Sequence, residues 1–488
     1  MATSLLIILF AFFVQFTDKA GSEHIALSQQ ALDKRAERSI SIDSMDYAVS
    51  PIYIDSLRNI GCHIYHTSRW MNGATIEADT VTIQTIAQWS FVDTVYVTRR
   101  GGDEAMRRGG DEAMRRGGEE AMRREVMRQG GEEASWQSDV QTELLNLHLL
   151  HEAGFRGEGI TMCIIDGGFQ NIDTLSAFLA AREEKRILGI YDMTDDMDSI
   201  TGETGNHGSK CFSTIAAITD DYHGTAIEAQ YYLIRSEETM TESPKEMDNW
   251  VAAIELADSL GVDIVSTSLG YSLFDDDHFT LSYADMDGQS TRSSRAATIA
   301  SRKGMLMVVA AGNDGNKPWH YIASPADADS ILTVGAVDIY DSIAAFSSWG
   351  PTADGRVKPE VCAVGYQTTL INPVNNSVVQ GNGTSFACPL IAGMAACLWS
   401  AIPYANNMEI REMIIRSANR YHSPHEQYGY GIPDAWEAYN QATAVETIPH
   451  KTSSAAKKVL VNGQLLILHQ GKMYDARGYR LEVIGYRL

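Results

Sequence analysis

Three side chains that lie far apart in the sequence carry the atoms of a nucleophilic catalyst. Ser385 supplies a hydroxyl, His207 an imidazole and Asp166 a carboxylate. A serine hydroxyl is a weak nucleophile until a base takes its proton, and an imidazole can take that proton and later return it to a leaving amine. A carboxylate fixes the imidazole tautomer and stabilises its cation. We therefore predict that Ser385 attacks, that His207 acts as base and acid, and that Asp166 orients His207.

The sequence around each of these residues favours a place at the end of a regular element. Asp166 ends an apolar run that is typical of a buried strand. His207 begins a run of small residues typical of a helix, and Ser385 stands at the first turn of an apolar helical pattern. A glycine near each of the three allows a substrate backbone to approach closely: Gly167, Gly208 and Gly383.

The chain order of the three side chains, Asp then His then Ser, is one of three known orders of the catalytic triad. Residues 382–389 read Asn-Gly-Thr-Ser-Phe-Ala-Cys-Pro, and residues 429–435 read Gly-Tyr-Gly-Ile-Pro-Asp-Ala. On these motifs the chain resembles the subtilisin-like serine proteases (subtilases, peptidase family S8). The resemblance implies an α/β catalytic domain and the hydrolysis of peptide bonds through an acyl-enzyme.

The resemblance also implies which groups hold the substrate. The negative oxygen of a tetrahedral intermediate needs donors, and the backbone N–H of Ser385 at a helix N-terminus is one. Residues 310–315, Ala-Ala-Gly-Asn-Asp-Gly, resemble the oxyanion segment of the family, so Asn313 is expected to donate from its side-chain amide. Residues Ser268, Leu269 and Gly270 resemble the segment that binds the substrate backbone as an added strand.

Three motifs depart from the wording that is usual in the family. The aspartate motif reads Asp166-Gly-Gly where Asp-Ser/Thr-Gly is common, and the histidine motif continues Gly208-Ser-Lys where Gly-Thr-His is common. The serine motif has Phe386 and Cys388 where Met and Ala are usual. No catalytic atom is removed, so these departures bear on substrate preference and local packing.

The elements that must position these residues follow an alternating pattern between residues 136 and 445, which we predict to be the catalytic domain. Near-continuous apolar strands between helices indicate a parallel sheet with helices on both faces, an α/β fold. Strands are expected at 160–166, 230–234, 262–266, 305–310 and 331–337, and helices at 140–153, 245–260 and 290–303. Sites in such sheets lie beyond the carboxyl ends of the strands, where Asp166 stands.

Two segments are expected before the catalytic domain and its linker. Residues 1–20 hold an apolar run at 5–14 with the length of a secretory signal peptide, and the alternative is a buried N-terminal strand or helix. Residues 21–98 have the pattern of a small α+β domain. Within them, residues 53–62 and 68–72 resemble the propeptide of secreted bacterial subtilisin-like proteases. That resemblance implies a domain that assists folding, inhibits the active site and is then cut off.

Residues 99–135 are a tandem repeat in which Arg-Arg-Gly-Gly-Asp-Glu-Ala-Met recurs from Arg99, Arg107 and Arg115. Glycine pairs at this spacing break helices, so the repeat is interpreted as an exposed linker of mixed charge. Two interpretations stay open. The repeat is either a neutral spacer expanded by duplication or a processing zone, because paired arginines in an exposed segment are accessible to trypsin-like proteases.

Residues 446–488 contain two hairpin signals, around Asn462-Gly463 and Gln470-Gly471. This tail resembles the C-terminal sorting signals of the Bacteroidetes type IX secretion pathway, a pattern that Lys472, Tyr474 and Gly478 fit. The resemblance implies a secreted or cell-surface protein and an outer-membrane secretion machinery as partner. The alternative is an ordinary small β appendage.

Composition narrows the partners. The chain has 63 acidic and 39 basic residues and a net charge of -24, which argues against nucleic acid as a partner. Its six cysteines lack metal-binding spacing and are interpreted as buried thiols rather than a disulfide framework. No metal site is assigned. The acidic cluster Asp275–Asp277 is a candidate for calcium, with a solvated loop as the alternative.

These inferences converge on a secreted serine endopeptidase that is made as a zymogen. Its partners are protein or peptide substrates and its own propeptide as inhibitor, and the mechanism requires no organic cofactor. One alternative is a catalytically silent surface binding protein on the same fold. Another is a narrow processing peptidase, which shares the chemistry and differs only in the selectivity of its cleft.

Overall fold

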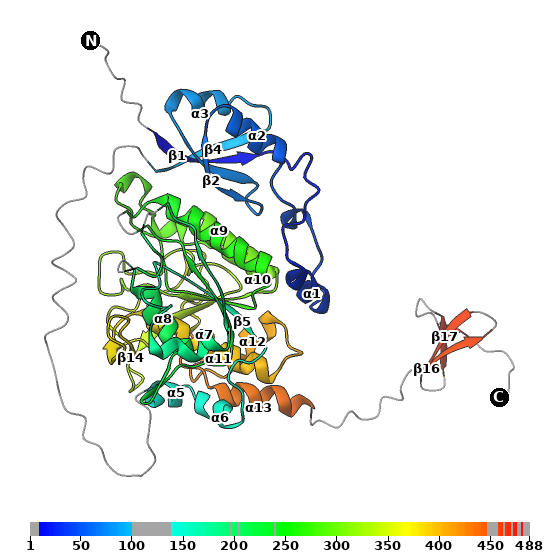
Figure 1. Cartoon of the computed structure of the whole chain (residues 1–488). Coiled ribbons are helices and arrows are strands. Elements are labelled where there is room, and N and C mark those ends of the chain that lie inside the picture. The colour runs from blue at the N-terminus through cyan, green and yellow to red at the C-terminus, as the bar shows by residue number, and fades with distance from the viewer. Residues whose placement is uncertain are drawn as a thin grey trace. The chain divides into compact units, whose positions relative to one another are not determined.

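The computed structural model describes residues 9–99 and 138–446, apart from 196–197, 203–204 and 239–240, together with strands between residues 457 and 481 (Figure 1). The chain divides into two compact units, residues 1–439 and 440–488. The predicted linker 99–135 lies outside the described residues except for Arg99, so its interpretation stays a prediction.

A seven-stranded sheet forms the centre of the larger unit, in the order β13-β12-β11-β10-β5-β9-β6. Every neighbouring pair runs parallel, which confirms the predicted sheet. The strands at its centre are buried because helices cover both faces. The strands are β5 (Thr161–Asp166), β6 (Ile187–Asp192), β9 (Gln230–Arg235), β10 (Ile264–Thr267), β11 (Leu306–Ala310), β12 (Leu332–Val337) and β13 (Val361–Val364).

Four helices matter for the site, and they form two layers (Figure 1). Helices α8 (His207–Ala216) and α11 (Thr384–Ala401) pack together on one side of the sheet. Helices α9 (Pro244–Leu260) and α10 (Arg292–Arg302) pack together on the other side. Among the described residues, only α11 has the length and apolar composition of a membrane span, and 89% of that stretch is buried inside this fold.

The predicted helix at 140–153 is wrong in its continuity. The structure has two short helices there, α5 (Asp139–Glu143) and α6 (Leu147–Glu152). Between them Asn146 has a φ of 48°, a left-handed conformation that asparagine tolerates better than most residues. Its side-chain amide donates to Asp434 Oδ2 at 2.7 Å, which holds the break.

The N-terminal domain is an antiparallel sheet in the order β2-β3-β1-β4, with helices α2 (Pro51–Asn59) and α3 (Thr80–Ile86). This confirms the predicted small α+β unit. Its strands are β1 (Phe10–Phe16), β2 (His63–Ser68), β3 (Gly73–Ala78) and β4 (Val92–Arg99).

Strand β1 differs from the expected signal peptide at residues 1–20. It pairs with β3 on one side and β4 on the other, so it lies inside the sheet. Phe12, Val14 and Phe16 point into the core and are at most 6% exposed. A cut after residue 20 would remove this strand, and the structure thus matches the alternative of a buried N-terminal strand.

Between β1 and α2 the chain makes an excursion that the sequence did not predict. We call residues 17–50 the arm, and its tip is helix α1 (Gln29–Glu37), which Ser28 caps by accepting from the Ala31 N–H. The outgoing and returning halves are hydrogen-bonded to each other. The Ala48 N–H donates to the His24 carbonyl and the Ala26 N–H to the Asp46 carbonyl, both at 2.9 Å.

The smaller unit contains four antiparallel strands in sequential order, which confirms the predicted hairpins. The turn residues at 462–463 and 470–471, and Gly478, lie outside the described residues. The strands are β16 (Lys457–Val461), β17 (Gln464–His469), β18 (Lys472–Asp475) and β19 (Arg480–Leu481).

Short elements complete the fold. They are α7 (Leu179–Glu183), α12 (Asn407–Arg416), α13 (Ala435–Glu446), β7 (Ile218–Thr219), β8 (Tyr222–His223), β14 (Thr368–Ile371), β15 (Val378–Gly381) and the 3₁₀ turns η1 (Ser44–Asp46), η3 (Ser176–Phe178), η4 (Asp277–Phe279) and η5 (Tyr283–Asp285). All six cysteines are buried and none forms a disulfide, which confirms that they are free thiols.

Candidate active site

The carboxyl ends of three neighbouring strands bring predicted site residues to one edge of the sheet. Asp166 ends β5, Ser268 follows β10, and Asn313 follows β11. Strand β10 is hydrogen-bonded to β5 on one side and to β11 on the other. Because the three strands are parallel, the segments that follow them emerge at the same edge.

Asp166 and His207 are in direct contact. His207 Nδ1 lies 2.7 Å from Asp166 Oδ1, and the same oxygen accepts from the Gly167 N–H at 2.7 Å. The Asp166 side chain is 1% exposed, whereas that of His207 is 41% exposed. The carboxylate is therefore shielded from water while the far side of the imidazole stays open.

The approach of α8 to β5 depends on a missing side chain. A Cβ at Gly208 would lie 2.5 Å from the Gly168 carbonyl oxygen and 2.8 Å from Asp166 Cβ. Real Cβ contacts of this length do not occur, and the nearer neighbour is backbone that cannot rotate away. Glycine after His207 is thus what lets the imidazole reach the carboxylate.

The electrostatics of this pair favour a charged imidazole. Desolvation lowers the pKa of His207, but the charge of Asp166 and its hydrogen bond outweigh that effect. The net pKa of His207 lies well above its usual value. A proton that His207 accepts is thereby stabilised by Asp166.

Ser385 stands in the first turn of α11 and is 6% exposed. The Ser268 hydroxyl donates to the Ser385 carbonyl at 2.8 Å, and Ser385 Oγ lies 3.5 Å from the Ser268 carbonyl oxygen. These contacts tie the start of α11 to the segment after β10. The serine hydroxyl and the expected substrate-binding segment 268–270 are thus adjacent.

Cys211 is a site residue that the sequence did not single out. Its Sγ lies 3.8 Å from His207 Nδ1 and donates to the Ser385 carbonyl at 3.3 Å. Cys211 therefore touches both residues and joins the serine segment to the Asp166–His207 pair. Its position four residues after His207, on the same face of a helix, was the signal that could have found it.

Asn313 is held in one orientation by the residue before Ser385. Its Oδ1 accepts from the Thr384 N–H at 2.9 Å and from the Thr384 hydroxyl at 3.1 Å. Because Oδ1 accepts these two bonds, the Nδ2 atom of Asn313 faces Gly383. It lies 3.8 Å from the position that a Cβ on Gly383 would take. Gly383 has a φ of 155° and carries no side chain into the space between Asn313 and Ser385.

Three carboxylates beside the site were also missed by the sequence analysis. Glu237, Glu242 and Glu246 have oxygens within 4.8 Å of one another, and the Tyr271 hydroxyl donates to Glu237 at 2.7 Å. Burial raises the pKa of Glu237 to about 7 and that of Glu242 to about 8, and neighbouring negative charges add to both shifts. Asp166 is one of the charges that act on Glu237.

The carboxylates of the candidate calcium loop Asp275–Asp277 accept hydrogen bonds from backbone N–H groups. Asp275 accepts from the Glu242 N–H at 3.0 Å, and Asp276 accepts from the His278 N–H at 3.0 Å. Within the described part of the chain, the close-set ligand groups are the three glutamates and the set of Asp166, His207 and Cys211. The loop is not among them, so calcium binding stays a prediction and no site is assigned to it.

Comparisons with known proteins agree with this arrangement. A family model described as "Subtilase family" matches residues 157–431, and one described as "Peptidase S8 propeptide domain, Bacteroidota" matches residues 11–109. The second match begins inside β1 and covers the arm.

Individual relatives are similar over the same region. The serine protease AprX of Bacillus subtilis (strain 168) is 26% identical over 309 residues, 57% of this chain and 66% of that protein. The thermophilic serine proteinase of Bacillus sp. (strain AK1) is 29% identical over 269 residues, 55% of this chain and 60% of that protein. Subtilisin DY of Bacillus licheniformis is 27% identical over 278 residues, 56% of this chain and 89% of that protein. The chain thus covers less than two thirds of the length of the first two relatives.

Proposed function

Because this chain belongs to the subtilase family, we propose that it is a secreted serine endopeptidase synthesised as an inactive precursor. The observation that carries the proposal is the 2.7 Å contact between His207 Nδ1 and Asp166 Oδ1, with Cys211 linking that pair to Ser385. A buried carboxylate behind an imidazole that is open on its far side is the arrangement that a base for a serine hydroxyl requires.

The proposed reaction has two halves. His207 Nε2 takes the proton of Ser385 Oγ, which attacks the substrate carbonyl, and His207 then gives the proton to the leaving amine. A water, activated by the same imidazole, hydrolyses the resulting acyl-enzyme. The Ser385 N–H and Asn313 Nδ2 donate to the oxyanion in both halves, and hydrolysis by this route requires no organic cofactor.

Substrate is proposed to bind as an extended strand along Ser268, Leu269 and Gly270. The contact of this segment with the serine segment supports this, because the Ser268 hydroxyl donates to the Ser385 carbonyl at 2.8 Å. A Cβ at Gly270 would lie 3.2 Å from Ala323 Cβ, so the backbone there packs closely against Ala323. Main-chain hydrogen bonds would then supply affinity that is independent of substrate sequence.

The N-terminal domain is proposed to act as inhibitor until the linker after β4 is cut. Its match to a propeptide domain supports this role, as does its packing against α9 in the same compact unit. The C-terminal unit is proposed to direct the protein to an outer-membrane secretion machinery and hence to the cell exterior. The resemblance of residues 472–478 to sorting signals supports this.

The test compares the full chain with its Ser385→Ala variant. We expect only the unaltered chain to cut itself between residues 99 and 138 and to take a fluorophosphonate label, both read by intact mass. If neither protein cuts or labels, even after trypsin has removed the linker, a catalytically silent binding protein becomes the better description. A peptide-library profile then distinguishes broad digestion from a narrow processing peptidase, which would cut very few sequences.

A further inference from the structure

The N-terminal domain contacts the catalytic domain through its sheet and through the arm, and the two contacts meet at Asp258, which accepts from Arg69 and from Arg35. Its sheet packs on α9, where Glu255 accepts from the Ser68 hydroxyl at 2.6 Å and from the Arg69 N–H at 2.9 Å. The arm reaches further along the same helix, to its last turn. There the Ser28 N–H donates to the Ser259 carbonyl at 2.8 Å, and the Ser259 hydroxyl donates to the Ala26 carbonyl at 2.7 Å.

The tip of the arm fits against the glycines that follow α9 and α10. A Cβ at Gly261 would lie 3.0 Å from the Ala31 backbone nitrogen, and one at Gly304 would lie 2.5 Å from Ile40 Cδ1. Both glycines have positive φ, 77° and 95°, as residues that end helices commonly do. The arm thus packs into the space that a side chain at Gly261 or Gly304 would occupy.

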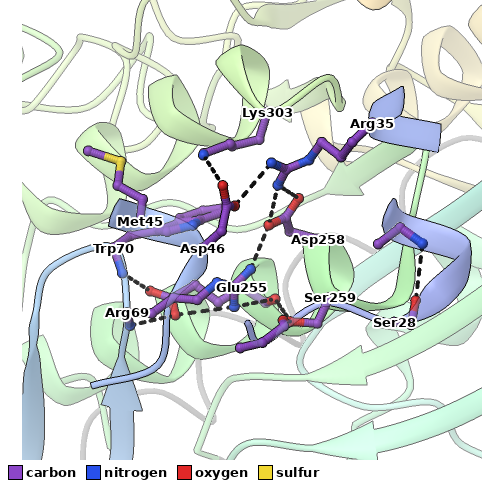
Figure 2. A network of polar contacts seen from close by, with 12 residues as sticks. Ser28, Arg35, Met45, Asp46, Arg69, Trp70, Glu255, Asp258, Ser259 and Lys303 are labelled. Carbon is purple, nitrogen blue, oxygen red and sulfur yellow. Dashed lines mark hydrogen bonds and ion pairs between the residues drawn. The ribbon is translucent and has the colours of Figure 1, made fainter. Parts of the chain in front are cut away.

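Charge complementarity holds the same contact (Figure 2). Arg35 donates to Asp258 at 2.7 Å and to Asp46 at 3.0 Å, and Lys303 of the enzyme domain donates to Asp46 at 2.8 Å. Arg35 is 4% exposed and Asp46 0%. Removing Arg35 leaves Asp46 paired with Lys303 and Asp258 paired with Arg69, but each buried carboxylate then has one cation fewer, which is unfavourable.

A second set of pairs lies at the margin of the contact. Lys34 donates to Asp263 at 2.5 Å and to the Gly261 carbonyl at 2.8 Å. Arg38 also donates to Asp263, donates to the Gly304 carbonyl at 3.1 Å, and lies over the Trp399 ring. These cations stand at the C-terminal ends of two helices, where the helix dipole favours positive charge.

This contact lies at the opposite edge of the sheet from the candidate active site. Helices α9 and α10 lead into the starts of β10 and β11, whereas Asp166, Ser268 and Asn313 stand at or beyond strand carboxyl ends. The 17 residues of α9 span about 25 Å between the two edges. The arm therefore cannot obstruct the cleft, and its contacts need another explanation.

We propose that the arm is a second docking element, which keeps the propeptide on the enzyme after the linker has been cut. Its receptor is the surface formed by Asp258, Gly261, Asp263, Lys303 and Gly304. The partner that fits this surface is the tip of the chain's own arm, from which Lys34, Arg35 and Arg38 reach it. The proposal rests on the inhibitory role given to the N-terminal domain above. Because sheet and arm belong to one domain, each raises the effective concentration of the other, so cleavage of the linker alone does not free the active site.

The test measures retention without requiring activity. The full-length Ser385→Ala chain receives a recognition sequence for a site-specific protease within residues 100–137 and is cut there. Release of the N-terminal fragment is then followed by size exclusion over time. The 2.9 Å hydrogen bond between His24 and Ala48 allows the arm to be excised between them and its ends joined by two glycines. We expect the armless fragment to leave at least about 100-fold faster, the scale of gain that linked sites provide.

Two further variants make the result specific. Lys34→Ala with Arg38→Ala removes the marginal pairs, whose side chains are each 20% exposed, and is expected to speed release at least about tenfold. Arg58→Ala is the matched control, because the exposed Arg58 pairs with Asp55 on its own helix and, among the described residues, with no carboxylate of the catalytic domain. Its release rate should stay within about twofold.

Equal release rates for the intact and armless fragments would overturn the proposal. If the armless chain does not fold, as judged by circular dichroism and melting, the double variant decides, and a rate equal to that of the Arg58→Ala control overturns the proposal. These outcomes are separate from failure of the proposed catalytic function, which would appear as absence of self-cleavage in the chain that keeps Ser385.

Discussion

Replacement of Asn313 offers the sharpest test of the proposed site, because its two side-chain atoms do different work. Oδ1 accepts two hydrogen bonds from Thr384, at 2.9 and 3.1 Å, and so holds the start of α11. Nδ2 is proposed to donate to the oxyanion. Asn313→Ala removes both functions, whereas Asn313→Asp keeps the acceptor and removes the donor.

Loss of the donor and loss of the acceptor should affect different quantities, kcat in the first case and the free energy of unfolding in the second. Loss of one oxyanion donor lowers kcat by about 100- to 1000-fold in subtilisin, or about 3–4 kcal/mol, a magnitude that we carry over to this relative. KM should change little, because the oxyanion exists only in the transition state. Loss of the acceptor leaves the Thr384 N–H unpaired, which costs about 1–2 kcal/mol of unfolding free energy.

The assay is steady-state kinetics on a chromogenic peptide, together with thermal melting of both variants. Asn313→Ala should lose kcat and melt lower than the unaltered protein. Asn313→Asp should lose at least as much kcat, because a negative charge then faces the oxyanion, yet it should melt near the unaltered protein. A kcat within tenfold of the unaltered enzyme for a folded Asn313→Ala variant would refute the reasoning.

Three other outcomes follow from the described contacts. Because the pKa of His207 is raised well above its usual value and the base must be neutral, kcat/KM should fall as pH drops through a value above about 6.5, and a profile still flat below that pH would contradict this. Gly208→Ala should separate His207 from Asp166 and lower kcat at least about 100-fold while the protein stays folded, as measured by kinetics beside circular dichroism. Burial raises the pKa of Cys211, so iodoacetamide should neither modify nor inhibit the native enzyme. The unfolded chain should react with the reagent at all six cysteines. Rapid inhibition of the native protein would contradict this, because it would show that Cys211 is accessible.

Most of the catalytic sheet could be predicted because its signal is local. The run that ends at Asp166 is apolar throughout, and such a run between helices predicts a buried parallel strand, which the structure confirms as β5. The boundaries of α9 and α10 came within two residues of prediction for the same reason. Periodicity could not reveal the break at Asn146, because a single left-handed residue barely disturbs an apolar pattern.

The N-terminus shows where a local pattern is ambiguous. An apolar run of this length fits either a signal peptide or a buried strand, and hydropathy does not distinguish them. Pairing of β1 with β3 and β4 favours the strand for residues 10–16, since a strand inside a sheet is hydrogen-bonded on both sides. That pairing joins residues more than 50 positions apart, so it cannot be recognised from the apolar run at residues 5–14 alone.

The sequence by itself determined the types and order of the proposed catalytic side chains, Asp166, His207 and Ser385, and the alternating elements that carry them. Only the tertiary structure decided which polar residues meet. Cys211 looks like any small buried residue in the sequence, yet it contacts both His207 and the Ser385 carbonyl. Arg35 looks like a solvated surface cation, yet it is buried against Asp258, 223 positions away. Apolar periodicity reports burial along one element, whereas contacts of polar groups depend on how distant elements cross, and so only the folded chain reveals them.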